Sequence, residues 1–273
     1  MVMSLNYVKD ILKKYTISPS KGLGQNFLID KEAVKRVIKA AELNSEDIVL
    51  EIGPGLGVLT QELAKKVTNV IAVEKDLKMV EILKETLKDF HNIEIIQGDI
   101  RKIDLKNYHL PKNYKVVANL PFYLTAPIIR RFLELDEVSP QLMVLVIQKE
   151  VGQRICAKPP EMSILAVSVQ FYAKPEIISF IPRTSFWPKP KVDAAVIKIT
   201  NITKPSLTED LFFKIVKAGF ANPRKQLINN LSKKLLLNRT KVENWLLKNK
   251  IQPERRAETL KVEDWVKLTR SYL

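Results

Sequence analysis

The chain has 273 residues, enough for one full-sized domain and a smaller one, with 45 Lys and Arg against 30 Asp and Glu. The net charge of +15 favours a polyanionic partner, although a basic surface that serves only solubility is an open alternative at this point. The single cysteine, Cys156, excludes an internal disulfide, and His91 and His109 form no zinc-ligand cluster. No segment resembles a signal peptide or approaches about 18 uninterrupted apolar residues, so we expect a cytoplasmic protein with no membrane contact and no metal ion.

Short β-branched runs alternate with helical patterns between residues 47 and 148. In chain order they are DIVLEI, a helix through Ala64, NVIAVE, a helix from Asp76 to Phe90, IEII, KVVAN, a helix near Pro127, and QLMVLVIQ. This alternation predicts an α/β fold with a parallel sheet that helices cover on both faces. Two later strands are predicted over ILAVSVQFY and VDAAVIKIT, separated by the proline-rich loop IPRTSFWPKPK.

The pattern changes after about residue 203. Four segments there carry apolar residues at helical spacing and none reads as a strand: LTEDLFFKIVKAGF, RKQLINNLSKKLLL, TKVENWLLKNK and KVEDWVKLTRSYL. Residues 204–273 contain 16 basic and 7 acidic side chains, a net +9 of the total +15. The sequence therefore predicts a catalytic domain over residues 1–203 and a basic helical domain over residues 204–273.

A glycine-rich turn follows the first predicted strand of the sheet. Gly53, Gly55 and Gly57 lie between DIVLEI and a helix that starts near Val58. Such glycines let the backbone pass close to a ligand. A dinucleotide fingerprint requires Gly or Ala where Val58 stands, and no Lys-Ser/Thr pair follows to bind phosphates. We therefore favour S-adenosylmethionine over a dinucleotide, with a purely structural turn as the third alternative.

Acidic residues follow the next two strands. Glu74 ends the second strand, where a carboxylate can accept hydrogen bonds from both hydroxyls of an adenosine ribose. Asp99 closes the third strand, where it can hold the amine of adenine. Each acid alone is equally compatible with a helix cap, which is the role expected for Asp76. Together with the glycine turn they predict an adenosine site at one edge of the sheet, because ligands of open α/β sheets bind there.

The stretch NLPF ends the fourth strand and suits a methyl transfer to an aromatic amine. The Asn119 side-chain oxygen and the Leu120 carbonyl can accept both N–H groups of such an amine and direct its lone pair at a methyl donor. Pro121 stiffens the turn, and Phe122 offers a face on which an extruded base can stack. Catalysis would rest on positioning and polar preorganisation. Taken alone, the segment is better explained as an Asn-Pro loop terminator.

Seven segments together resemble the ribosomal RNA adenine N6-dimethyltransferase family, in particular its bacterial KsgA type, over nearly the whole chain. They are KGLGQNFLID at 21–30, VLEIGPGLG at 49–57, VEKD at 73–76, GDI at 98–100, NLPF at 119–122, QKEVGQRI at 148–155 and FWPKPKVDAAV at 186–196. The resemblance implies a Rossmann-like methyltransferase fold with a mostly parallel seven-stranded sheet and a small all-helical C-terminal domain. Phe122 stands where the family commonly has Tyr, so stacking is retained while a hydroxyl is lost.

The resemblance also implies a role for each matched residue. Catalytic contacts fall to Asn119, Leu120, Pro121, Phe122 and the second stacking ring Phe186. The S-adenosylmethionine contacts fall to Asn26, Leu28, Gly53, Gly55, Glu74, Asp99, Ile100 and Asn119. Candidates for RNA phosphates in the helical domain are Arg224, Lys225, Lys233 and Lys234, each of which is equally compatible with a solvated helix face.

The implied reaction is dimethylation of N6 in two adjacent adenosines of the 3′-terminal hairpin loop of small-subunit ribosomal RNA, linked to assembly of that subunit. We expect a monomer that acts on the RNA or on the immature 30S-type subunit. Two alternatives remain at this stage. One is a large-subunit RNA methyltransferase of the antibiotic-resistance type, and the other is a noncatalytic RNA-binding assembly or transcription factor on the same fold.

Overall fold

The computed structural model describes residues 5–20, 22–108, 110–135 and 139–272; Lys21 of the KGLGQNFLID segment and His109 lie outside this description. Contacts divide the chain into two compact units, Met1–Gly152 with Pro175–Ile202 and Gln153–Lys174 with Thr203–Leu273. The sequence-based boundary is a single one, after residue 203. By contacts, residues 153–174 instead group with the C-terminal helices, and the ring of Phe171 stacks on that of Phe212 at 3.8 Å between centroids.

A seven-stranded sheet forms the centre of the first unit, in the order β4-β3-β2-β5-β6-β9-β7. The first five of these strands run parallel, and β9 runs antiparallel to β6. Their bounds are β2 Ile48–Ile52, β3 Asn69–Glu74, β4 Ile93–Gln97, β5 Lys115–Asn119, β6 Leu142–Gln148, β7 Lys174–Ile181 and β9 Ala194–Thr200. The predicted mostly parallel seven-stranded sheet is confirmed.

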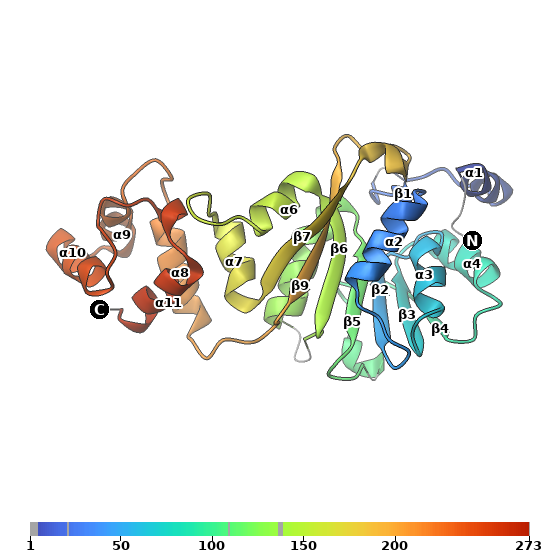
Figure 1. Cartoon of the computed structure of the whole chain (residues 1–273), viewed down its shortest axis with the longest axis horizontal. Coiled ribbons are helices and arrows are strands. Elements are labelled where there is room, and N and C mark those ends of the chain that lie inside the picture. The colour runs from blue at the N-terminus through green and yellow to red at the C-terminus, as the bar shows by residue number, and fades with distance from the viewer. Residues whose placement is uncertain (1–4, 21, 109, 136–138, 273) are drawn as a thin grey trace. The chain divides into compact units, whose positions relative to one another are not determined.

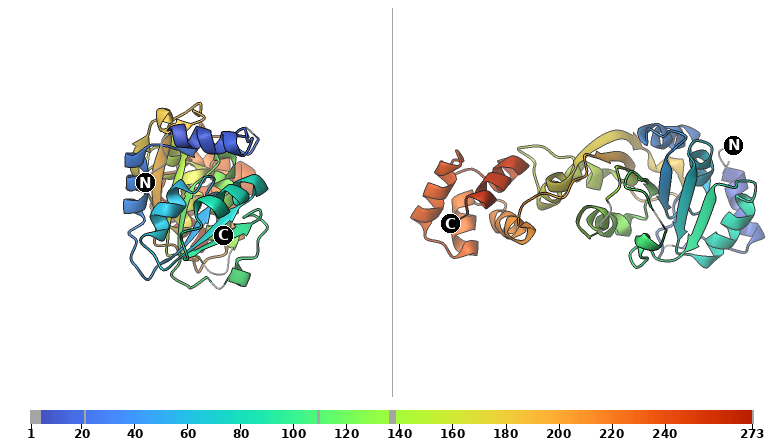
Figure 2. Two further views of the ribbon diagram at one scale, coloured as in Figure 1. Left: turned by 90° about the vertical axis from the view of Figure 1, so that its right-hand side faces the viewer. Right: turned by 90° about the horizontal axis from the view of Figure 1, so that it is seen from below.

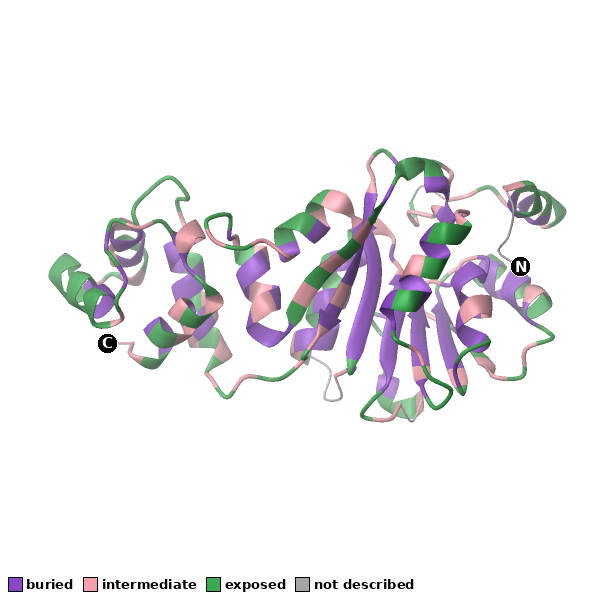
Figure 3. Ribbon diagram, in the orientation of Figure 1, coloured by how far each residue is buried: buried purple, intermediate pink, exposed green. Residues whose placement is uncertain are grey.

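Apolar β-branched residues build the central strands because both sheet faces are covered there. Strands β5 and β6 are buried along almost their whole length, whereas β7 carries alternating exposed residues (Figure 3). Helices α2 and α3 pack against each other beside the sheet (Figure 1). The helices of this unit are α1 Leu5–Lys14, α2 Lys31–Ala40, α3 Val58–Ala64, α4 Leu77–Thr86, α5 Thr125–Arg130 and α6 Lys149–Ile155, which ends just beyond the unit boundary. The expected cap is confirmed at Asp76, and Asp30 forms another; both carboxylates accept backbone N–H groups of the helices that follow.

The predicted strand over ILAVSVQFY is wrong. This segment is helix α7, Ile164–Tyr172, which begins where the Ser163 hydroxyl accepts the backbone N–H of Ala166 at 3.2 Å. Within it, residues 167–171 (VSVQF) alternate apolar and polar side chains as a half-buried strand does, so the local pattern favoured the wrong element. The strand of this region is β7, which follows directly, while the predicted strand over VDAAVIKIT is confirmed as β9.

The four helices predicted in the C-terminal region are all present. They are α8 Glu209–Gly219, α9 Leu227–Leu235, α10 Arg239–Lys248 and α11 Val262–Arg270. Within the described part of residues 203–273 the ribbon contains helices and loops and no strand (Figure 2). Trp245 and Trp265 are fully buried and anchor the core of this unit. Nowhere in the described chain is a helix long and apolar enough to span a membrane.

Candidate active site

One cavity of the first unit lies at the carboxyl ends of β2, β3 and β5, beside the loop after β4. All of the residues assigned above to catalysis or cofactor contact line it: Asn26, Leu28, Gly53, Gly55, Glu74, Asp99, Ile100, Asn119, Leu120, Pro121, Phe122 and Phe186. Among the other residues that line it are Glu51, Arg101 and Tyr123, to which the sequence argument gave no role. The fold therefore brings six separate segments of the chain to one concave site, as expected for an open α/β sheet.

The glycine turn gives the cavity a backbone wall. Gly53 and Gly55 adopt φ of +66° and +58°, a conformation that other residues rarely tolerate. A Cβ atom on Gly55 would lie 3.1 Å from the Phe27 ring, closer than ordinary van der Waals contact. The Gly53 N–H is bonded to the Val73 carbonyl at 2.9 Å, which fixes the turn to the end of β3. A ligand here meets main chain rather than side chains.

A two-stranded antiparallel sheet joins the GQNFL and FWPKPK segments. Strand β1, Phe27–Leu28, pairs with β8, Phe186–Trp187, so that Leu28 lies opposite Phe186. The Asp30 carboxylate, besides capping α2, accepts the Ser185 hydroxyl at 2.7 Å. This hydrogen bond is the largest cause that lowers the pKa of Asp30. The pairing places two motifs that are far apart in sequence on the same wall of the cavity.

Asn119 is fixed through its amide nitrogen. Its Nδ2 donates to the backbone carbonyl of Asn26 at 3.0 Å, and the Nδ2 of Asn26 donates to the Gly24 carbonyl at 3.1 Å. Among the described residues no donor contacts the Asn119 side-chain oxygen or the Leu120 carbonyl. Both acceptors that the methyl-transfer hypothesis requires are therefore unused by the protein, and both belong to residues that line the cavity.

Glu51 and Glu74 form a buried acid pair, with exposed fractions of 1% and 7%. Backbone N–H groups of Gly55 and Asp76 donate to the two Glu74 oxygens at 3.1 and 2.9 Å, which orients the carboxylate. Burial nevertheless raises the pKa of Glu74. Burial also raises the pKa of Glu51 to about 8, and its Oε2 atom has no hydrogen-bond partner in the protein. A buried carboxyl beside a cavity with one oxygen unpaired is suited to a cationic ligand.

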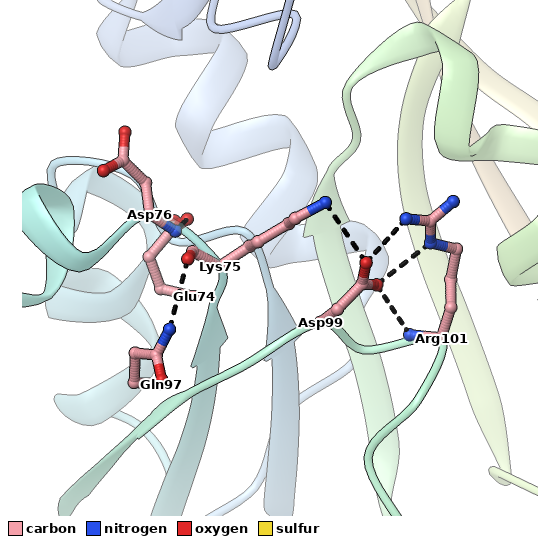
Figure 4. Close-up of polar contacts among 6 residues, drawn as sticks. All are labelled: Glu74, Lys75, Asp76, Gln97, Asp99 and Arg101. Atoms are coloured by element: carbon pink, nitrogen blue, oxygen red, sulfur yellow. Dashed lines mark hydrogen bonds and ion pairs between the residues drawn. The ribbon is translucent and has the colours of Figure 1, made fainter.

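Lys75, Asp99 and Arg101 form an exposed ion-pair cluster (Figure 4). The Asp99 carboxylate binds the Arg101 guanidinium with an Nη2–Oδ2 distance of 2.6 Å and the Lys75 ammonium at 3.2 Å. The Arg101 contact is the largest cause that holds the pKa of Asp99 well below its usual range. The carboxylate assigned to adenine is thus placed as expected, but two cations that the sequence argument did not foresee already occupy it.

Aromatic rings border the same cavity. Phe122 is half-buried and Phe186 is almost fully buried, whereas Tyr123 is 47% exposed. The Tyr123 ring would contact a Cβ on Gly24 at 3.5 Å, so it lies against the GLGQNFL segment. Flat faces at two levels of burial are typical of sites that stack an unpaired base.

A family model named "Ribosomal RNA adenine dimethylase" matches residues 18–272. The chain belongs to this family. Dimethylases of this family are methyltransferases, and S-adenosylmethionine is the cofactor of this enzyme, whose substrate is ribosomal RNA. The Rossmann-like fold inferred from the resemblance is therefore confirmed together with the family.

Curated relatives agree with this membership. A protein of Dehalococcoides mccartyi named "Ribosomal RNA small subunit methyltransferase A" is 41% identical over 271 residues, covering 97% of this chain and 92% of the relative. A protein of the same name from Alkaliphilus metalliredigens is 41% identical and covers 98% of this chain and 97% of its own.

Two solved structures share the fold over most of the chain. The 23S rRNA methyltransferase ErmE has a TM-score of 0.74 and 26% identity, covering 90% of this chain and 99% of its own. A dimethyladenosine transferase from Plasmodium falciparum has a TM-score of 0.73 and 27% identity, covering 88% and 94%.

The basic residues assigned to RNA in the helical unit are all exposed. Arg224 and Lys225 lie in the loop between α8 and α9, and Lys233 and Lys234 lie in the last turn of α9. No ion pair with an acidic side chain occupies them among the described residues. Their exposure is compatible with contact to phosphates and equally with a solvated surface, so their role is a proposal.

Proposed function

We propose that this dimethylase modifies N6 of two adjacent adenosines in the 3′-terminal hairpin loop of small-subunit ribosomal RNA. The single observation that carries the choice of subunit is the identity of about 41% to relatives named for the small subunit, against 26% to a structure named for 23S RNA. We further propose a monomeric, metal-independent enzyme that acts in the cytoplasm on naked RNA or the immature 30S-type subunit.

The cavity fits S-adenosylmethionine in its shape and its charges. The backbone wall of Gly53 and Gly55 admits the methionine part, beside the Glu51 carboxyl, whose unpaired Oε2 suits an ammonium group. Asn26 and Leu28 lie on the segment that would cover the cofactor. Bound there, the cofactor supplies an electrophilic methyl group on a sulfonium.

Adenosine recognition falls to the acids at the strand ends. Glu74, held by backbone N–H groups, is assigned to the ribose hydroxyls, and Asp99 with Ile100 to the adenine. Polar protein groups fixed in this way need little rearrangement when a ligand binds, which is the physical basis of preorganisation.

The target amine is assigned to the two unused acceptors. The Asn119 side-chain oxygen and the Leu120 carbonyl accept its two N–H groups, which draws the nitrogen lone pair out of the ring and directs it at the methyl donor. Phe122 and Phe186 hold the base by stacking, worth about 1–3 kcal/mol per base. A loop base costs less to extrude than a paired one. The helical unit contributes phosphate contacts through Arg224, Lys225, Lys233 and Lys234.

The test is methylation of immature small subunits and of large-subunit RNA with labelled S-adenosylmethionine, followed by mapping of the modified nucleotides. We expect dimethyladenosine at two adjacent loop positions of the small-subunit RNA. Modification confined to large-subunit RNA would favour the other branch of the family. Binding of RNA with no methyl transfer to either substrate would favour a noncatalytic factor.

A further inference from the structure

The acceptor capacity of Asp99 is already filled by the protein. Its Oδ1 accepts the backbone N–H and the Nε–H of Arg101, both at 3.0 Å, and its Oδ2 accepts Nη2 of Arg101 at 2.6 Å and Nζ of Lys75 at 3.2 Å. A carboxylate offers about four lone-pair sites. A further donor can therefore bind the Asp99 carboxylate only if one of these four hydrogen bonds breaks. The backbone N–H of Arg101 is fixed by the chain. The mobile members are the two cationic side chains in Figure 4.

Of these two cations, Arg101 borders two concave sites. It lines the active-site cavity and also a neighbouring groove that contains Pro127, Arg130 and Arg131, whereas Lys75 lines only the active-site cavity. The Arg130 side chain in this groove is 69% exposed, and its Nε donates to the Glu134 carboxylate at 2.8 Å. The guanidinium of Arg131 is held by the Ile103 carbonyl at 2.6 Å. The acidic member of the groove, Asp104, accepts the backbone N–H of Lys106 at 3.1 Å.

The character of the groove matches one class of ligand. Arginines beside an apolar proline surface are typical of channels that follow a single-stranded nucleic-acid backbone. Because the groove shares Arg101 with the active site, a strand that leaves the active site with its base extruded passes this side chain first. A phosphate is negatively charged like the Asp99 carboxylate, so it is an alternative partner for Arg101. A guanidinium binds both groups in bidentate geometry.

We propose that Arg101 exchanges the Asp99 carboxylate for a backbone phosphate of the RNA when the adenine amine of the cofactor takes its place, so that cofactor and RNA bind with positive coupling. This inference rests on the proposed function, since it takes both ligands from it. Without cofactor, Arg101 is held by Asp99 and contributes little to RNA binding. Without RNA, the adenine amine must compete with Arg101 for Asp99. Thermodynamic linkage makes the two effects equal in size.

The experiment measures RNA affinity by fluorescence anisotropy with and without S-adenosylhomocysteine, on a labelled hairpin with two adjacent loop adenosines. In the unmodified protein we expect saturating S-adenosylhomocysteine to tighten RNA binding about fivefold or more. In Arg101→Met the tightening disappears, RNA binds more weakly than to the unmodified protein in the presence of S-adenosylhomocysteine, and calorimetry without RNA shows a higher affinity for S-adenosylhomocysteine. Lys102→Met is the matched control, because Lys102 is an exposed cation one residue away that lines neither cavity, and it keeps the coupling.

The outcomes separate this inference from the proposed function. Coupling that persists in Arg101→Met, or an affinity of that variant for S-adenosylhomocysteine that is unchanged or lower, overturns the exchange. Binding of both ligands to the unmodified protein with no coupling overturns it as well, and leaves the proposed function intact. If the unmodified protein binds no S-adenosylhomocysteine, the proposed function itself fails.

Discussion

The buried acid pair and the exposed ion-pair cluster line one cavity, but the pKa values of their carboxyl groups are shifted in opposite directions. Glu51 and Glu74 lose water without gaining a cation, so burial raises the pKa of both. Asp99 gains two cations, and its pKa falls. The difference teaches that the buried side of the site is incomplete without a positively charged or hydroxyl-bearing ligand, whereas the exposed side is satisfied and must be opened.

The largest expected effect comes from Asn119, which belongs to neither group and links the cavity to Asn26 through its amide nitrogen. Asn119→Ala removes one of the two acceptors for the target amine and should lower the methylation rate about 100-fold or more. Single-turnover methylation assays measure this rate, and thermal unfolding and RNA binding should change little. Normal turnover by this variant would contradict the role of the amide.

The second effect tests the buried acid pair at the ribose position. Glu74→Gln removes the charge that accepts the ribose hydroxyls and should weaken S-adenosylhomocysteine binding about tenfold or more, since hydrogen bonds to charged groups are the strong ones. Titration calorimetry measures the affinity. Glu32→Gln, at an exposed acid on α2, is the control and should bind normally. Equal affinities for the two variants would sink the ribose assignment.

The third effect depends on pH and concerns Glu51. Its pKa of about 8 in the folded chain lies above the ordinary 4.5, so the free enzyme holds a proton there at pH 7. A cationic ligand favours the carboxylate, and binding should release about one proton at pH 7. Calorimetry in buffers of different ionisation enthalpy measures the release, and Glu51→Gln should abolish it.

The same group predicts a trend in folding stability. Because the pKa of Glu51 is raised in the folded state, its contribution to the free energy of unfolding is fully present below pH 4.5. This contribution is lost as the pH rises towards about 8. The melting temperature of Glu51→Gln, relative to that of the unmodified protein, should therefore increase as the pH rises from 4.5 to about 8. A constant difference between the two would mean that Glu51 ionises normally.

The smallest effect is expected on the exposed side of the cavity. Asp99→Asn removes an acceptor for adenine but also releases Arg101 and Lys75, which are 41% and 48% exposed. Ion pairs of such exposure contribute little, so we expect S-adenosylhomocysteine affinity to fall by less than about threefold. A loss as large as that of Glu74→Gln would show that the two sides of the cavity are not as different as their electrostatics indicate.

Most of the fold followed from periodicity, and the exceptions have identifiable causes. The alternation of strands and helices over residues 47–148 and the four C-terminal helices are present as predicted. The error at α7 arose because residues 167–171 alternate apolar and polar side chains over too short a run to distinguish a helix from a strand, and Ser163 was the unused sign of a helix start. Strand β7 was missed because it lies at the edge of the sheet and exposes Ile178 and Phe180.

The positions of site residues at strand ends were predictable from motifs, whereas the hydrogen-bond and ion-pair partners of their side chains were not. Glu74, Asp99 and Asn119 each follow a strand, and the topology of a parallel sheet brings such positions together. The pairing of Asp99 with Arg101 depends on side-chain rotamers, which sequence spacing does not fix. Glu51 was hidden within an apolar strand, although a lone acid directly before a glycine turn was a signal that could have found it.

The short pairing of β1 with β8 has a consequence for synthesis of the chain. Leu28 leaves the ribosome early, and its partner Phe186 follows only after most of the sheet has been made. A nascent chain therefore exposes half of the ligand-binding wall for most of its elongation, and closing it requires a contact between residues far apart in sequence. The ability to bind the methyl donor should consequently arise late and as a single event, when the segment that carries Phe186 emerges from the ribosome.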